Sequence, residues 1–127
     1  MKTTLPILFL LVASLLVSCA GTAARQSALL PAIASSWSAV RVQVTRELAA
    51  APDPAGTAAV FDADAALAKG DPVAIAAVPW SLLEGLALAD VQRREAAAEI
   101  GPGVAKILRG RLADLAESRS LYLRRTQ

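Results

Sequence analysis

Few side chains in this 127-residue chain are able to perform acid–base or nucleophilic chemistry. The sequence contains no histidine, which excludes a Ser-His-Asp triad, a histidine general base and every histidine-containing metal site. Cys19 is the only cysteine, so no intramolecular disulfide can form. A nucleophilic lysine would have to be Lys69 or Lys106, and both are expected to be exposed. The sequence therefore predicts a protein that is not an enzyme and carries no cofactor.

Three aspartates in the segment FDADAALAKGD are spaced in a way that suggests a calcium-binding loop: Asp62, Asp64 and Asp71. The segment departs from that pattern at Ala66 and at the position of the turn glycine. Its alanine-rich flanks favour a helix, on which side chains two residues apart do not face each other. We therefore expect a solvated helix face and no metal site.

Glu84, in the segment PWSLLEGLAL, is the one carboxylate in strongly apolar surroundings. A buried glutamate of this kind suits a general acid, and a cell-wall enzyme would need one. The neighbouring residues do not match a transglycosylase motif, however, and the chain is too short for an accompanying sugar-binding cleft. The favoured interpretation is a structural glutamate near a helix boundary.

Trp37, Trp80 and Tyr122 are three of the four large aromatic residues that follow Cys19, and Phe61 is the fourth. Two interpretations are open for the first three. They line a small apolar pocket between helices, as in a carrier of an apolar ligand, or they fill a core otherwise made of alanine. Core filling is the commoner role of such residues.

The residues before Cys19 have the features of a secretory signal. Lys2 gives a positive start, residues 5–17 are apolar apart from Pro6 and Ser14, and small residues follow. A transmembrane helix needs about 20 apolar residues, and this run is shorter. Residues 1–18 are therefore expected to be a signal peptide that is removed.

The segment LVSC, residues 16–19, resembles the lipobox of bacterial lipoproteins, and the resemblance covers residues 1–20 only. It implies cleavage between Ser18 and Cys19, a diacylglycerol on the Cys19 thiol and acylation, for example with palmitate, of the new amino terminus. Several acyl chains on one residue give stable membrane anchoring. In that family an aspartate after the cysteine tends to retain the product at the inner membrane. Ala20 at this place implies the periplasmic leaflet of the outer membrane in a host with two membranes.

Prolines and glycines divide the rest of the chain, and alanine, the best helix former, fills the intervals. Asp-Pro at 53–54 and at 71–72 places a capping carboxylate before a proline suited to the first helical turn. Gly70 suits a C-terminal cap, and Gly-Pro-Gly at 101–103 interrupts a helix. The predicted helices are residues 22–50, 54–69, 72–99 and 102–124.

Two of these helices carry apolar residues at helical spacing. In the first they are Leu30, Ile33, Trp37, Val40, Val44 and Leu48, and in the last Val104, Leu108, Leu112, Leu115 and Tyr122. Residues 72–83 carry no charge and include Pro79, so we expect a buried, kinked segment there. Short connections make consecutive helices antiparallel neighbours.

Charge is distributed unevenly along the chain. Residues 47–105 hold nine acidic residues against three basic ones, whereas residues 106–127 hold six basic residues against two acidic ones. A basic end suits nucleic acid, anionic lipid or an acidic partner, and nucleic acid is not expected outside the cytoplasm. We interpret the pattern as acidic middle helices that neutralise a basic last helix, with Arg111 and Arg119 paired at the surface or between helices.

These patterns together predict an all-α fold, a small antiparallel bundle of about four helices. A single domain over residues 22–127 would follow a short tether, residues 19–21, that is bound to the membrane by lipid. The expected role is structural or protein-interacting in the cell envelope, with another envelope protein as partner. The alternatives are a carrier of a small apolar ligand, a cell-wall enzyme, or a phage lysis accessory lipoprotein, although the proline-rich tail often seen in the last is absent.

Overall fold

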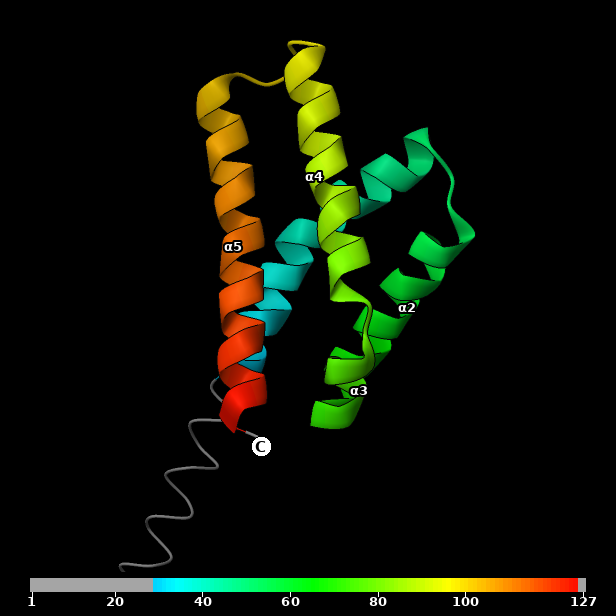
Figure 1. The fold of residues 1–127 in the computed structure, drawn as a ribbon, viewed down its shortest axis with the longest axis vertical. Coiled ribbons are helices and arrows are strands. Elements are labelled where there is room, and N and C mark those ends of the chain that lie inside the picture. Colours follow the sequence, from blue (N-terminus) through cyan, green and yellow to red (C-terminus); the bar gives the residue numbers. More distant parts are fainter. Residues whose placement is uncertain (1–28, 126–127) are drawn as a thin grey trace, which may run out of the picture.

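The computed structural model describes residues 29–125, which are predominantly helical and contain no β-strand (Figure 1). Within this part of the chain the prediction of an all-α fold is confirmed. The helical segments are an N-terminal helix over residues 29–50, α2 (Pro54–Lys69), α3 (Pro72–Ala77), α4 (Trp80–Ala96) and α5 (Pro102–Arg125). The predicted signal peptide, the lipobox and the tether lie outside the described residues.

The helices pack around one main core. The helices α4 and α5 lie side by side and run antiparallel, and α2 contacts both α3 and α4 (Figure 1). The N-terminal helix, cyan in Figure 1, crosses obliquely behind α4 and α5. All five helical segments contribute buried apolar side chains to the core, among them Ile33, Ala63, Ile75, Leu83 and Leu115. A smaller cluster of Val91, Ala105 and Leu108 joins α4 to α5.

The start of α2 and of α3, and the end of α2, are formed as the sequence predicts. The Asp53 carboxylate accepts a hydrogen bond from the Ala55 amide at 3.1 Å, and Asp71 accepts one from Val73 at the same distance. In both helices a proline fills the first turn, where its missing N–H costs nothing. Gly70 ends α2 in the left-handed conformation, with φ of 66°.

The predicted helix over residues 72–99 is divided in two at Pro79. Proline has no N–H, so it cannot donate to the Ile75 carbonyl four residues earlier, and α3 ends at Ala77. The indole Nε1 of Trp80 donates to that carbonyl at 2.7 Å. The indole thus gives a short hydrogen bond to the acceptor that the proline leaves without its helical donor, beside a longer one of 3.4 Å from the Val78 amide. The helix α4 begins at Trp80.

The end of α4 also differs from the prediction, because the helix stops at Ala96 and not at residue 99. Ala98 has φ of 57°, in the left-handed region. The Ala98 amide donates to the Glu95 carbonyl at 3.1 Å, and the Glu99 amide donates to the Arg94 carbonyl at 2.9 Å. This pair of bonds is a Schellman motif, which usually has glycine where this chain has alanine.

The strain at Ala98 gives a testable prediction. Ala98→Gly should raise the free energy of unfolding by about 0.5–1 kcal/mol. Glycine adopts the left-handed conformation at a lower energetic cost than alanine, and this gain exceeds the loss that comes from the greater freedom of glycine in the unfolded chain. Chemical denaturation followed by circular dichroism measures the change. Ala97→Gly is the matched control, since Ala97 has an ordinary φ of −82° and the variant should lose stability. A destabilised Ala98→Gly protein would contradict this account of the helix end.

Candidate functional site

The structure brings two of the three singled-out aromatic residues into direct contact and buries all three. The rings of Trp37 and Trp80 meet edge to face, with centroids 5.9 Å apart and planes at 81°. Tyr122, from the far end of α5, belongs to the same buried cluster. Each is at most 3% exposed. These residues therefore pack as part of the core.

The polar edge of Trp37 is held by an aspartate from α2. The Nε1 of Trp37 donates to Asp64 Oδ1 at 2.7 Å, and Arg41 donates to both Asp64 oxygens at 3.0–3.2 Å. Burial raises the pKa of the Asp64 carboxyl, but the hydrogen bonds from Arg41 and Trp37, together with the positive charge of Arg41, outweigh burial, and the pKa lies below its usual value. Asp64 thus acts as a clamp between the N-terminal helix and α2.

Glu84 belongs to an ion pair and is not an isolated acid. Arg119 Nη2 donates to Glu84 Oε1 at 2.7 Å, and the guanidinium carbon of Arg119 lies 5.4 Å from the ring centroid of Trp80. The contact joins α4 to α5 by a charge pair and a cation–π interaction. Arg119 therefore forms the interhelical pair that the sequence suggests, and Glu84 is its partner.

Tyr122 closes the same core from the end of α5. Its hydroxyl donates to the carbonyl of Gly70 at 3.3 Å, a weak hydrogen bond that connects α5 to the cap of α2. Burial, together with the negative charge of Asp71, raises the pKa of the Tyr122 phenol above its ordinary value. The phenol is therefore an uncharged structural donor at neutral pH.

The aspartates of the calcium-like segment do not converge. Asp64 binds Arg41 and Trp37, Asp71 caps α3, and Asp62 points from an exposed face of α2. Across residues 29–125 no three acidic or thiol side chains gather in a group that would hold a metal ion. Each of these carboxylates has a different local role.

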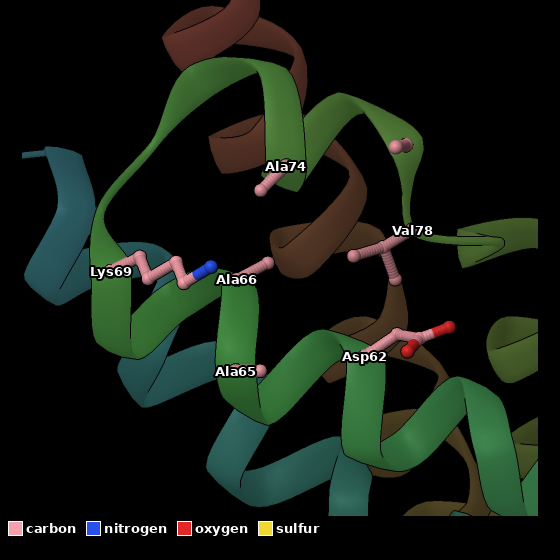
Figure 2. Close-up of a pocket in the computed structure, with 7 residues that line it drawn as sticks. Asp62, Ala65, Ala66, Lys69, Ala74 and Val78 are labelled. Atoms are coloured by element: carbon pink, nitrogen blue, oxygen red, sulfur yellow. The ribbon is translucent and has the colours of Figure 1, made fainter.

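Two shallow grooves flank α2. Figure 2 shows the first, a space of about 260 Å³ lined mainly by alanines, with Asp62 and Lys69 at its two ends and Ala74 and Val78 on the opposite wall. The second, of about 330 Å³, lies between the N-terminal helix and α2 and contains the exposed ring of Phe61. Neither groove is lined by the two tryptophans or by Tyr122.

A charged cluster that the sequence analysis does not identify lies at the other end of α4. The Asp90 side chain is fully buried, and Arg93 Nη2 donates to its Oδ1 at 2.9 Å. Arg46 and Arg94 approach Asp90 Oδ2 at 3.9 and 3.8 Å, and that oxygen has no hydrogen bond. Arg93 also pairs with Glu47 of the N-terminal helix at 3.2 Å. The cluster joins α4 to the N-terminal helix through charge.

Burial raises the pKa of the Asp90 carboxyl above its ordinary value of 3.8, and the nearby arginines offset only part of this effect. The folded chain therefore binds this proton more tightly than the unfolded chain does. The stability that Asp90 contributes is fully present below about pH 3.8 and is lost as the pH rises through the folded-state pKa.

The direction of the Asp90 pKa shift gives a second prediction, which is tested with the variant Asp90→Asn. Because asparagine does not titrate, the stability of the variant relative to the wild type should increase as the pH rises from about 3 through the folded-state pKa, and then level off. Denaturant unfolding of both proteins at several pH values measures the difference. A difference that falls with pH would show that the arginines outweigh burial, and a flat difference would show that the two effects balance; either result would contradict the raised pKa.

A third groove, called the basic groove below, lies beside this cluster. It has a volume of about 250 Å³ and is bounded by the N-terminal helix, α4 and α5. Its lining residues are Ala39, Val42, Gln43, Arg46, Arg94, Val104, Leu108 and Arg111. Three arginines from three different helices thus surround one groove. The sequence contains a signal for it, since Gln43 is a polar residue beside the apolar positions 40 and 44.

The comparisons with known proteins found no match in family models, in curated proteins or among solved structures. None of the described helices is long and apolar enough to cross a membrane.

Proposed function

We propose that this chain is the precursor of a bacterial lipoprotein. The proposal rests on the segment LVSC at residues 16–19, which lies at the end of an apolar run that is preceded by the positive charge of Lys2. Residues 1–18 are removed, and Cys19 receives the lipid that anchors the mature protein. The mature protein lies in the cell envelope, at the periplasmic leaflet of the outer membrane in a host with two membranes.

The helical part of the protein has a structural or protein-interacting role and no catalytic one. Its partner is another envelope protein, and nucleic acid is not a partner. This role is supported by the structural contacts that four acidic side chains make. Asp53 and Asp71 cap helices, while Asp64 and Glu84 each bind an arginine of another helix. The N-terminal helix, α2, α4 and α5 form the proposed four-helix bundle, and α3 is a short insertion between α2 and α4.

The sorting part of the proposal is tested with Ala20→Asp in a host with two membranes. The wild-type chain should partition with detergent and sediment with outer-membrane fractions in a density gradient. Ala20→Asp should move most of the protein to the inner-membrane fractions, because the resemblance to lipoproteins implies retention by an aspartate at this position. Ala20→Ser is the control and should keep the wild-type distribution. A wild-type chain found in the aqueous fraction would overturn the anchoring proposal, and an unmoved Ala20→Asp variant would overturn the sorting proposal.

A further inference from the structure

The basic groove contains a buried amide without a partner. Gln43 is 2% exposed, and neither its Oε1 nor its Nε2 has a hydrogen bond in the described protein. Leaving a buried polar group unpaired costs about 1–3 kcal/mol, and buried amides are nearly always bonded. Gln43 lines the groove, but both of its amide atoms are shielded from solvent, so the side chain has to turn toward the groove before a bound ligand can supply a donor and an acceptor partner.

The arginines of the groove have N–H groups that make no hydrogen bond within residues 29–125. Arg46 and Arg94 stand 3.9 and 3.8 Å from Asp90 Oδ2, which is an ion-pair distance, but that oxygen accepts no hydrogen bond. Arg94 also lies 3.8 Å from Glu99. Arg111 is exposed and has no ion-pair partner among the described residues. Guanidinium groups recognise carboxylates and phosphates through paired N–H donors, so this arrangement suits an oxyanion.

The remaining lining is aliphatic. Val42 and Val104 stand on the N-terminal helix and on α5, and each is about half exposed (55% and 48%). Ala39 and Leu108 complete the apolar surface. An inorganic ion would leave these side chains in water, whereas an aliphatic chain attached to the oxyanion would cover them, at about 25 cal/mol per Å² of apolar surface.

We propose that the basic groove binds a small amphipathic oxyanion, a carboxylate or phosphate head on a short aliphatic chain. The groove, with a volume of about 250 Å³, is larger than a single water molecule or small ion needs, so it has room for a short chain beside the head group. The head group lies between Arg94, Arg46 and Arg111, with Gln43 as an additional donor. The aliphatic chain lies along Val42 and Val104. This site is independent of the lipid anchor, because its residues lie between 39 and 111.

The test is isothermal titration calorimetry on the full-length chain in a non-ionic detergent. The probes are hexanoate and hexyl phosphate, with acetate, inorganic phosphate and hexanol as the head-only and tail-only controls. At least one of the two amphipathic anions should bind at least tenfold more tightly than its own head group alone and than hexanol. Binding of hexanoate only would identify a carboxylate ligand, and binding of hexyl phosphate only would identify a phosphate ligand.

Two variants separate the groove from non-specific effects of the detergent. Arg111→Gln should weaken binding at least tenfold, whereas Lys106→Gln, which removes an exposed charge from the same helix outside the groove, should leave it unchanged. Gln43→Leu should weaken binding by a similar factor and should melt at the same temperature as the wild type or above it, because it removes the unpaired amide. A purely structural glutamine would not give both results.

The proposal would be overturned if neither amphipathic anion bound with a dissociation constant below about 10 mM, or if hexanol bound as tightly as hexanoate. The same conclusion follows if Arg111→Gln and Gln43→Leu both bind as the wild type does while keeping its circular dichroism spectrum. Heat from partition into micelles is common to all variants, so the differences between variants report on the groove.

Discussion

Replacement of Trp80 by alanine is expected to lower the free energy of unfolding by about 3–5 kcal/mol, the range for a large buried aromatic side chain. The Trp80 indole makes three separate contacts. It meets the edge of Trp37, its Nε1 donates to the Ile75 carbonyl, and Arg119 lies over its ring. Four of the fifteen buried residues in the main core are alanines, which bury little apolar area each. A loss of this size is a large part of the 5–15 kcal/mol that stabilises a typical domain.

Trp80→Phe is the matched control. It keeps an aromatic ring but removes the indole N–H, so the Ile75 carbonyl at the proline break loses its strongest donor. The expected cost is about 1–3 kcal/mol, which is smaller than that of alanine. Urea denaturation followed by circular dichroism measures both variants. A loss below about 1 kcal/mol for Trp80→Ala would mean that the two tryptophans are not central to the core.

Cys19→Ala is expected to abolish processing altogether. The resemblance to lipoproteins implies that lipid attachment precedes cleavage and that both act at this residue, so the variant should accumulate as the uncleaved precursor, 18 residues longer than the mature chain. The apolar run would remain attached and keep the variant at the inner membrane. An immunoblot of cell fractions distinguishes precursor from mature protein by size.

The control for this variant is Ser14→Ala, which changes a small residue in the same segment without touching the predicted cleavage site. It should be processed as the wild type is. If Cys19→Ala is cut at the normal rate and released, an ordinary signal peptidase removes the leader and the lipobox interpretation is wrong.

The helix boundaries set by local chemistry could be predicted from the sequence. Asp53 with Pro54, Asp71 with Pro72, and Gly70 each act through a capping bond or a backbone conformation within a few residues. The prediction failed at Ala98, because alanine is a poor signal for a left-handed cap. At Pro79 the sequence indicated a kink, but the clean break depends on the Trp80 indole reaching the Ile75 carbonyl.

The candidate sites were harder to predict, because they depend on which helices meet. Arg46, Arg94 and Arg111 come from three helices, and their spacing along the chain does not indicate that they share a groove. Asp90 lies on the buried face of α4 with Leu83 and Ala87, and a charge on that face is a signal that could have been used. The predicted pairing of Arg111 and Arg119 is confirmed for Arg119, whose partner is Glu84. It is wrong for Arg111, which has no ion-pair partner among the described residues.

The most direct test of the central claim is mass spectrometry of the amino-terminal peptide of the mature protein, purified from cell envelopes. The lipoprotein proposal predicts that the peptide begins at Cys19 and carries a diacylglycerol on its sulfur, with a further acyl chain on its amino group. A mature protein whose first residue is any other one, or whose Cys19 is an unmodified thiol, would contradict the proposal.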